Sequence, residues 1–242
     1  MHYTYDLHLH SCLSPCGDED MTPANLVNMA ALLGLDIIAL TDHNSAGNCR
    51  SAIQAGEQVG ILVLPGMELC TAEEIHMVCL FPTADQAEQF AQEVYKSLPP
   101  IKNRPDIYGR QLFMDTDDGI LGEEPLLLVT ASGISIDDAP ALAKHYGGIC
   151  YPAHIDRASF SVLSSFGVFP RHLKFPVAEV SRNGNLQALR DAHPALQQVK
   201  LIGASDAHYL EDILPPEEDR VMELPERTPA AVLHWLEQGG KT

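Results

Sequence analysis

Residues 5–10 read YDLHLH, a short segment in which apolar and polar side chains alternate. Side chains alternate across a β-strand, so Asp6, His8 and His10 are expected on one face, with the two leucines on the other, in an apolar layer. Two imidazoles on one strand face can hold one metal ion. An H-x-H pair alone is a weak signal, because such pairs also occur as structural features, so its meaning depends on the rest of the chain.

Short apolar runs alternate with helical patterns along the chain. This alternation predicts βα units and a mainly parallel sheet. The predicted strands cover residues 5–10, 36–43, 61–69, 74–81, 126–131, 148–154, 177–181, 201–208 and 220–224. In a parallel α/β barrel the C-terminal strand ends meet on one rim, where active sites are built. Polar side chains at these ends are therefore expected to lie together.

Several later strands end in histidine or acidic residues, in the motifs TDH, GME, PAH and DAH. Another predicted strand, EIHMVCLF, carries His76 within an apolar run, where an unpartnered imidazole would be costly. Chance does not readily produce so many clusters of this kind, so the sequence predicts a metal site. The predicted metal ligands are His8, His10, His43, Glu68, His76, His154, Asp206 and His208.

The mixture of imidazole and carboxylate favours Zn, Mn or Fe over Mg or Ca, which prefer shells made of oxygen. The predicted ligands exceed the needs of one ion, and they can fill two or three sites only if a carboxylate bridges. Glu68 is the candidate bridge. Paired metal ions clamp the oxygens of a transferring phosphoryl group and generate hydroxide near neutral pH.

In this order, the motifs HLHS, TDH, GMEL, EIH, PAHIDR and SDAH resemble those of the polymerase and histidinol phosphatase (PHP) superfamily, over about residues 5–210. The resemblance implies an α/β fold, a distorted (β/α)7 TIM-like barrel, with a trinuclear site for phosphoester hydrolysis. Within the superfamily the chain is similar to small stand-alone bacterial members. Small phosphate esters and nucleotides are the substrates that this similarity implies.

The resemblance also implies how the metal ligands are shared. Position by position, it assigns His8, His10, Glu68 and Asp206 to a first metal, Glu68, His76 and His154 to a second, and His43 and His208 to a third. The family has a further third-metal ligand a few residues after H-x-H. Here the stretch SCLSPCGDED departs from the family pattern and offers Cys16, Asp18 or Asp20.

The predicted reaction is attack by a metal-activated hydroxide in line on phosphorus, with catalytic roles for Glu68, Asp206 and His208. The general acid is left open, and His208 is one candidate. Arg157 and Arg182 follow predicted strands and are candidates for gripping phosphate oxygens, although either could form a surface ion pair. Asp6 and Asp42 could orient ligand imidazoles, or simply be strand-end carboxylates.

Composition restricts the partners. The chain has 242 residues, with 15 Lys and Arg against 33 Asp and Glu, for a formal net charge of −18. Long nucleic acid and anionic membranes would be repelled by this charge, so a small phosphorylated substrate is expected. No apolar run approaches the length of a membrane span, and the six cysteines show no disulfide pattern, so a cytoplasmic location is expected.

The length suits one large α/β domain. Together with the family resemblance, this predicts a single PHP domain over residues 1–242. Residues 97–124, with several prolines and an Asp118-Gly119 turn, predict an inserted loop or hairpin. The oligomeric state is left open.

Two alternatives to the phosphoesterase remain. An amidohydrolase-type C–N hydrolase also begins with H-x-H on its first strand, but the TDH strand end and His208 beside Asp206 favour a three-metal phosphoesterase. A non-catalytic metal-binding sensor domain needs only about four ligands in a closed site, fewer than this chain offers.

Overall fold

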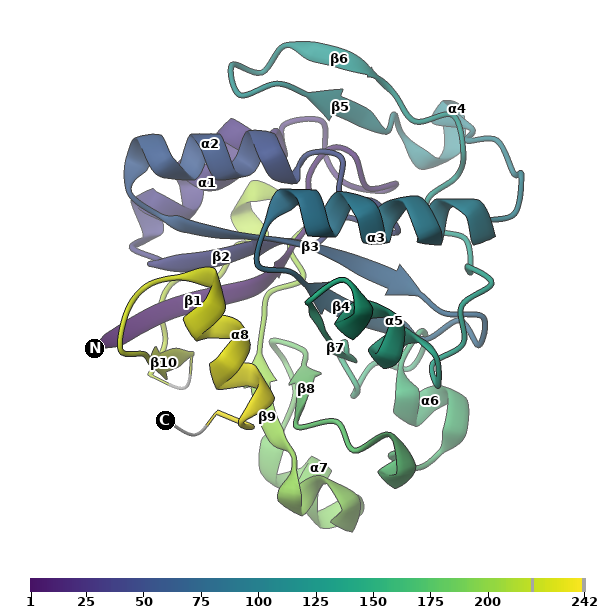
Figure 1. Cartoon of the computed structure of the whole chain (residues 1–242), viewed down its shortest axis with the longest axis vertical. Helices are drawn as coiled ribbons and strands as arrows, with labels where there is room; N and C mark the ends of the chain where they lie inside the picture. The colour runs from purple at the N-terminus through teal and green to yellow at the C-terminus, as the bar shows by residue number, and fades with distance from the viewer. Residues whose placement is uncertain (219, 241–242) are drawn as a thin grey trace.

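The computed structural model describes residues 1–218 and 220–240. In this part of the chain, strands form a curled six-stranded sheet in the order β10-β1-β2-β3-β4-β7, together with the pairs β5-β6 and β8-β9 (Figure 1). The strands are β1 His2–Leu9, β2 Ile37–Leu40, β3 Leu62–Cys70, β4 His76–Leu80, β5 Leu112–Met114, β6 Ile120–Glu123, β7 Ile149–Pro152, β8 Val177–Val180, β9 Lys200–Gly203 and β10 Val221–Glu223. The fold is thus mixed α/β, compatible with a TIM-like barrel.

Helices connect most of these strands. They are α1 Pro23–Leu33, α2 Cys49–Val59, α3 Ala84–Ser97, α4 Pro105–Tyr108, α5 Ala139–His145, α6 Val162–Phe166, α7 Leu186–Ala192 and α8 Pro229–Glu237, with 3-10 turns at Arg171–Leu173, Pro194–Gln198 and Leu210–Asp212. As the sequence suggests, α1 begins at the cap Thr22, whose side chain accepts a hydrogen bond from Asn25 N, and ends at Gly34 in the left-handed conformation. Among the described residues, no helix combines the length and the hydropathy needed to cross a membrane.

Two apolar layers enclose the sheet. Helices α1 to α3 lie on one side of β2 and β3 in Figure 1, and Ile38 and Leu40 of β2 belong to the core that these helices complete. The alternate residues, Ile37 and Ala39, pack in a second core that includes Trp235 of α8. β2 is therefore buried on both faces, as strands in parallel sheets usually are.

The alternation expected for residues 5–10 is interrupted. The pairing of β1 with β2 shifts register between Asp6 and Leu9. As a result Leu7 packs in the core that contains α8, whereas Leu9 packs in the core that contains α1. The expectation that both leucines share one face was wrong, because an irregularity in the strand reverses the side-chain parity after it.

The sheet is less parallel than the sequence predicted. Strands β1 to β3 are parallel, but β4 runs antiparallel to both β3 and β7. The link from Cys70 to His76 is a short turn in which Thr71 N donates to Ile75 O, and so short a link joins antiparallel strands only. The reversal brings His76, at the start of β4, level with the C-terminal end of β3.

The strand predicted at residues 126–131 does not form. Leu127 and Leu128 are buried, but the only strand-like pairing in this stretch is an isolated bridge from Leu126 to Lys102. Side chains accept or donate most of its other backbone hydrogen bonds: Asn44 Nδ2 donates to Leu128 O at 2.7 Å, and Gln111 Nε2 donates to Leu126 O at 2.6 Å, while Leu127 N donates to Ile101 O. The apolar run indicated burial correctly, and the error was to equate burial with a strand.

The β8-β9 pair lies between β7 and the C-terminal end of β1. Ile155 N, just after β7, donates to Glu179 O of β8, and His10 N donates to Ala207 O beyond β9. Residues 97–124 form α4 and the β5-β6 hairpin, which projects at the top of Figure 1. Leu112 N of this hairpin donates to Cys12 O, so the hairpin rests on the loop that follows β1.

A close backbone approach at Gly66 predicts sensitivity to a single methyl group. An added Cβ would lie 2.8 Å from Cys79 O and 2.7 Å from a Leu80 methyl group. We expect Gly66→Ala to lower the free energy of unfolding by about 1–3 kcal/mol, as overpacking of a filled interior does. Urea denaturation measures this change. Gly122→Ala is the matched control, because no atom lies within 4 Å of the added carbon; equal stabilities for the two variants would contradict the prediction.

Candidate metal centre

The carboxylate of Glu68 in β3 is fully buried and is surrounded by imidazoles from the ends of other strands. The nearest nitrogen–oxygen distances are 3.3 Å to His8 Nε2, 3.4 Å to His10 Nε2, 3.0 Å to His43 Nδ1, 2.9 Å to His76 Nδ1 and 3.0 Å to His154 Nε2. His43 and His154 come from the segments just after β2 and β7, and His76 arrives because β4 is reversed. One carboxylate therefore faces five imidazoles, as a bridging metal ligand would.

Asp206 supplies the second carboxylate of the cluster. Its Oδ1 lies 3.1 Å from His10 Nε2 and 3.4 Å from His8 Nε2. Asp206 and His154 both have positive φ, at 52° and 26°, a strained conformation for residues other than glycine. The His208 ring stacks on His10 with centroids 4.1 Å apart. Asp206 and His208 thus extend the cluster from the loop beyond β9.

Three imidazoles are anchored so that their Nε2 atoms face the cluster. His8 Nδ1 lies 2.9 Å from Glu179 Oε1, His10 Nδ1 lies 2.8 Å from Ser14 Oγ, and His208 Nδ1 lies 3.0 Å from Asp206 O. A carboxylate or a carbonyl can only accept, so the proton is assigned to Nδ1 of His8 and His208. The Nε2 lone pairs are then left for a metal, the usual arrangement of metal-ligating histidine.

Candidate sets of ligand atoms within coordination reach of one another fall into three groups in the described part of the chain. The groups are His8, His10, Glu68 and Asp206; His43, Glu68 and His76; and His10, His43 and His208. The first matches the set that the family resemblance implies for the first metal. The second group holds His43 where the resemblance implies His154, which contacts Glu68 but belongs to none of the three groups, and the third group adds His10 to the implied His43 and His208.

The donors fit divalent transition metals. Among the described residues, Glu68 Oε2, Asp206 Oδ1, His76 Nε2 and His154 Nδ1 are buried without a hydrogen-bonding partner. Buried polar atoms left unpaired are costly, and a metal ion would satisfy the carboxylate oxygens. Imidazole with carboxylate is a donor set that suits Zn, Mn or Fe.

Charges within the cluster shift the pKa values in opposite directions. Burial lowers the pKa of His10, but Asp206 and Glu68 outweigh it and raise the pKa to about 9. His8 also has its pKa raised well above its usual range, because Glu179, Glu68 and Asp206 outweigh burial. Burial prevails at His43 and His208, where it lowers the pKa to about 4 and about 3. The imidazoles hold the pKa of Glu68 well below its usual range despite burial.

Glu179 is a site residue that the sequence analysis missed. It is fully buried in β8, where both carboxylate oxygens approach His8 Nδ1 and Oε1 accepts a hydrogen bond from His154 N at 3.1 Å. One signal was available: a lone carboxylate inside the apolar strand VAEV must have a partner if it is buried.

Neither Asp6 nor Asp42 touches an imidazole directly. Asp42 Oδ1 accepts a hydrogen bond from Ser14 Oγ at 2.7 Å, and the same Oγ meets His10 Nδ1, so Asp42 acts on His10 through Ser14. Asp6 Oδ1 accepts from Ser205 N at 3.1 Å and so holds the backbone just before Asp206. The idea that Asp6 orients an imidazole was wrong, since its partners are backbone amides.

The two arginines differ in their placement. Arg157 Nη2 lies 2.7 Å from Asp206 Oδ2, at the rim of the cluster, with the arginine side chain 46% exposed. Arg182 Nη1 instead donates to Asp212 Oδ1 at 2.8 Å. The structure therefore brings Arg157, but not Arg182, into contact with the predicted ligands.

The stretch after β1 lies near the cluster without joining it. Cys16 is exposed, with φ of 66°. Its thiol is nevertheless partly removed from water, and this desolvation, followed by the charges of Asp206 and Glu68, raises the pKa of the thiol. Asp18 N donates to His208 O at 3.0 Å, while the Asp18 carboxylate accepts from Asp20 N. Neither Cys16 nor Asp18 belongs to a candidate group in the described part of the chain.

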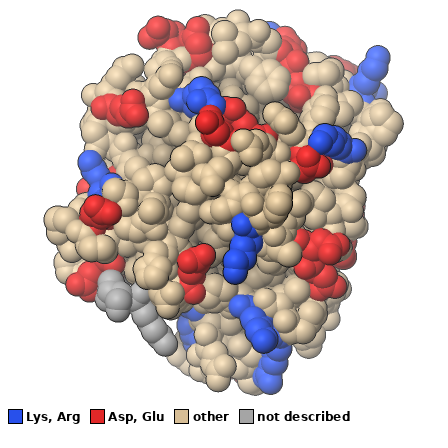
Figure 2. Space-filling view, in the orientation of Figure 1, with Lys and Arg blue, Asp and Glu red and all other residues tan. Residues whose placement is uncertain are grey.

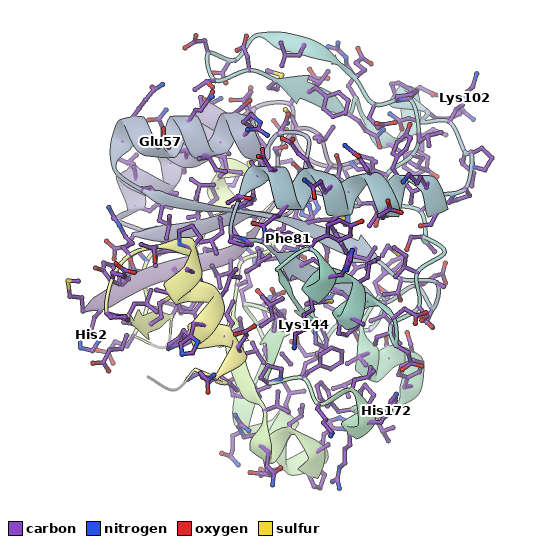
Figure 3. The ribbon with its side chains drawn as sticks, in the orientation of Figure 1. His2, Glu57, Phe81, Lys102, Lys144 and His172 are labelled. Carbon is purple, nitrogen blue, oxygen red and sulfur yellow. The ribbon has the colours of Figure 1, made fainter. Side chains whose placement is uncertain are left out.

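The remaining histidines lie elsewhere. Figure 3 shows His2 and His172 on the periphery of the molecule, and His172 Nε2 pairs with Asp137 at 2.8 Å. Acidic and basic side chains are interspersed on the face drawn in Figure 2, which shows no extended basic surface.

Comparison with known proteins identifies the family of this chain. Residues 6–147, more than half of the chain, match the PHP domain model. The chain belongs to the PHP domain family.

One curated relative is the 5'-3' exoribonuclease of Haemophilus influenzae, 38% identical over 79 residues, which are 31% of this chain and 28% of that protein. Among solved structures, the lesion-specific endonuclease Q of Pyrococcus furiosus aligns with a TM-score of 0.67 at 16% identity, over 100% of this chain and 57% of that one. This chain therefore spans under a third of the first relative and little more than half of the second.

Two structures of similar size share the fold. A proposed metal-dependent phosphoesterase from Bifidobacterium adolescentis has a TM-score of 0.61 at 19% identity, covering 98% of this chain and 96% of that one. An amidohydrolase from Chromobacterium violaceum, solved with bound sulfate, has a TM-score of 0.61 at 20% identity with the same coverage. Identities this low show the fold alone.

The anchoring of His8 by Glu179 predicts a weaker site when that anchor is altered. Glu179→Gln keeps the shape of the side chain but removes its charge, and we expect metal affinity to fall by about 10–100-fold, as when partners of ligating histidines are changed. Competition with a chromophoric chelator measures the affinity. Glu57→Gln, on the exposed surface of α2 (Figure 3), is the control and should match the wild type. Wild-type affinity in Glu179→Gln would remove Glu179 from the site.

Metal loading is also expected to release protons. The raised pKa values of His8 and His10 mean that both imidazoles are protonated near neutral pH in the metal-free protein, and a metal must displace a proton from Nε2. Affinity should therefore rise with pH through the region of about 9, where His10 loses its proton. Calorimetric titration in two buffers with different ionisation enthalpies counts the protons; equal heats in both buffers near neutral pH would contradict the expectation.

Proposed function

We propose that this protein is a metal-dependent phosphoesterase that hydrolyses a small phosphate ester or nucleotide at a dinuclear or trinuclear site. The observation that carries the proposal is the buried Glu68 carboxylate facing five imidazoles, with Asp206 beside two of them. A single structural ion needs about four ligands, so this excess supports more than one ion. Membership of the PHP family, whose relatives and neighbours include nucleases and a proposed phosphoesterase, supports the same reaction class.

Each residue has a proposed part. His8, His10, Glu68 and Asp206 would hold one ion. Following the family resemblance, Glu68, His76 and His154 would hold a second ion and His43 and His208 a third, although His43 also lies within reach of Glu68 and His76. Zn, Mn or Fe in such a site lowers the pKa of bound water and neutralises charge on phosphoryl oxygens. Glu179 and Ser14 keep the imidazoles of His8 and His10 oriented.

We propose that Arg157 binds the phosphate group of the substrate. Its half-exposed guanidinium is already held at the rim by the Asp206 carboxylate, so an incoming phosphate needs to move it little. Guanidinium groups bind phosphate oxygens through paired, charge-assisted hydrogen bonds. Arg182 is the weaker candidate for binding the phosphate, because it pairs with Asp212 and contacts none of the predicted ligands.

The choice of substrate rests on charge. A net charge of −18 disfavours long polyanions, whereas bound divalent ions would make the rim locally attractive to a small anion. The exoribonuclease and the endonuclease named above act on nucleic acids according to their names, so both phosphomonoesters and nucleotide diesters belong among the substrates to test.

We also propose that residues 1–242 form one PHP domain, with residues 97–124 as its insert. Support for a distorted (β/α)7 barrel comes from strands β1, β2, β3, β4, β7, β8 and β9, since the hydrogen bonds at Ile155 and His10 link the β8-β9 pair to the segments that follow β7 and β1.

Hydrolysis is the direct test. We expect Mn-reconstituted protein to release phosphate or nucleoside from members of a panel of phosphomonoesters, nucleotides and cyclic or bisphosphorylated nucleotides. His10→Ala and Asp206→Ala should fall to the background rate of the metal-free protein, because each removes a ligand at the centre of the cluster. His145→Ala, an exposed histidine at the end of α5, is the control and should keep full activity.

Other outcomes would redirect the proposal. Full activity in His10→Ala and Asp206→Ala would place the reaction elsewhere. Silence of the wild type across the phosphoester panel, with turnover of amides, would indicate an amidohydrolase. Tight metal binding without turnover of either class would indicate a sensor domain.

A further inference from the structure

The loop between β7 and α6 carries a candidate metal ligand, an arginine and an exposed aromatic side chain within seven residues, from His154 to Phe160. Arg157 reaches Asp206, as described above, and the Phe160 ring stacks on His76 with centroids 4.8 Å apart and an interplanar angle of 24°. His76 Nδ1 in turn lies 2.9 Å from Glu68. Only the imidazole of His76 therefore lies between the Phe160 ring and the Glu68 carboxylate at the centre of the cluster.

Phe160 is held rigidly in this position. Its carbonyl oxygen accepts a hydrogen bond from His76 N at 2.9 Å. The next residue, Ser161, is fully buried, caps α6 and donates through Oγ to Arg157 O at 2.7 Å. Phe160 also has a φ of 54°, a strained conformation for a bulky residue. Backbone strain of this kind concentrates at ligand-binding sites.

The ring is nevertheless not buried. Phe160 is 41% exposed, although it lies flat against a buried imidazole. Two other exposed aromatic residues are near the cluster: Tyr209 follows His208 directly, and Tyr108 O accepts a hydrogen bond from Cys16 N. A half-exposed aromatic ring stacked on an imidazole of the cluster offers a flat surface to a planar group.

We propose that Phe160 is a stacking platform for the nucleobase of a nucleotide substrate, whose phosphate is taken up by the metal cluster and Arg157. The inference rests on the proposed phosphoesterase function and narrows its substrates to esters whose alcohol carries a planar heteroaromatic ring. Aromatic side chains bind bases by stacking with little dependence on base identity, so the platform would select for a base rather than for one particular base.

A purely protective role is the alternative account, in which the ring only shields His76 from water. The two roles separate with Phe160→Leu, which keeps an apolar cover over His76 but removes the flat face, and with Phe160→Trp, which enlarges that face. Leucine and tryptophan both carry a Cβ, so both variants face the same positive φ as Phe160 does in the wild type. Phe166→Leu, in the same segment and 42% exposed, is the matched control.

The experiment compares AMP, glycerol 3-phosphate and inorganic phosphate on the Mn-reconstituted protein. We expect Phe160→Leu to weaken AMP binding and raise its KM by about 10-fold or more, as loss of one base–aromatic stack does. Affinity for inorganic phosphate, kcat/KM for glycerol 3-phosphate and metal content should stay within about twofold of the wild type. Phe160→Trp should bind AMP at least as tightly as the wild type, and Phe166→Leu should be unchanged.

The outcomes distinguish this inference from the proposed function. Unchanged AMP affinity in Phe160→Leu, no AMP binding by the wild type, or equal losses for AMP and inorganic phosphate would overturn the stacking platform, even if phosphoesters are hydrolysed. AMP binding that depends on Phe160 in a protein that hydrolyses no phosphoester would support the platform and overturn the phosphoesterase.

Discussion

The buried charge of Glu68 is the constraint on which the rest of this structure depends. A carboxylate removed from water is stable only when opposite charge or hydrogen-bond donors surround it. Here the partners are imidazoles that come from β1, β4 and the segments after β2 and β7. None of these elements alone can satisfy Glu68, so the site exists only in the assembled sheet.

A second set of contacts gives the cluster its chemistry. Glu179, and Asp42 acting through Ser14, bind the Nδ1 side of His8 and His10, which turns the Nε2 atoms toward Glu68 and Asp206. Without these anchors the same imidazoles could rotate and pair with the carboxylates in several ways. Fixed orientation is what distinguishes a metal site from a group of buried ion pairs.

The geometry also links metal binding to substrate recognition. The loop from His154 to Phe160 supplies one candidate ligand, a guanidinium at the rim and a ring stacked on another ligand. Ser161 ties this loop to the start of α6, and His76 N ties it to β4. Recognition of a phosphate or a base would thus use residues whose positions are already set by the cluster.

Much of this protein follows from its sequence. The ligand types, their strand-end positions and the α/β alternation are local properties, and five of the predicted histidines gather around Glu68, whereas Cys16 and Asp18 join no candidate group in the described part of the chain. The wrong predictions about the fold all concern strand pairing. The short Cys70–His76 link reverses β4, and the irregularity in β1 places Leu7 and Leu9 in different cores. Residues 126–131 form no strand, and the side chains of Asn44 and Gln111 donate hydrogen bonds to their backbone carbonyls.

Residue type and position in a strand therefore determined which side chains could bind metal, because ligand chemistry and side-chain alternation act over a few residues. Only the tertiary structure decided how they are oriented and what stands beside them. Glu179 is 171 residues from His8, and Arg157 meets Asp206 across two further strands. Contacts between such distant residues form only when burial of the apolar layers closes the sheet. The pattern of residues within one strand does not predict them.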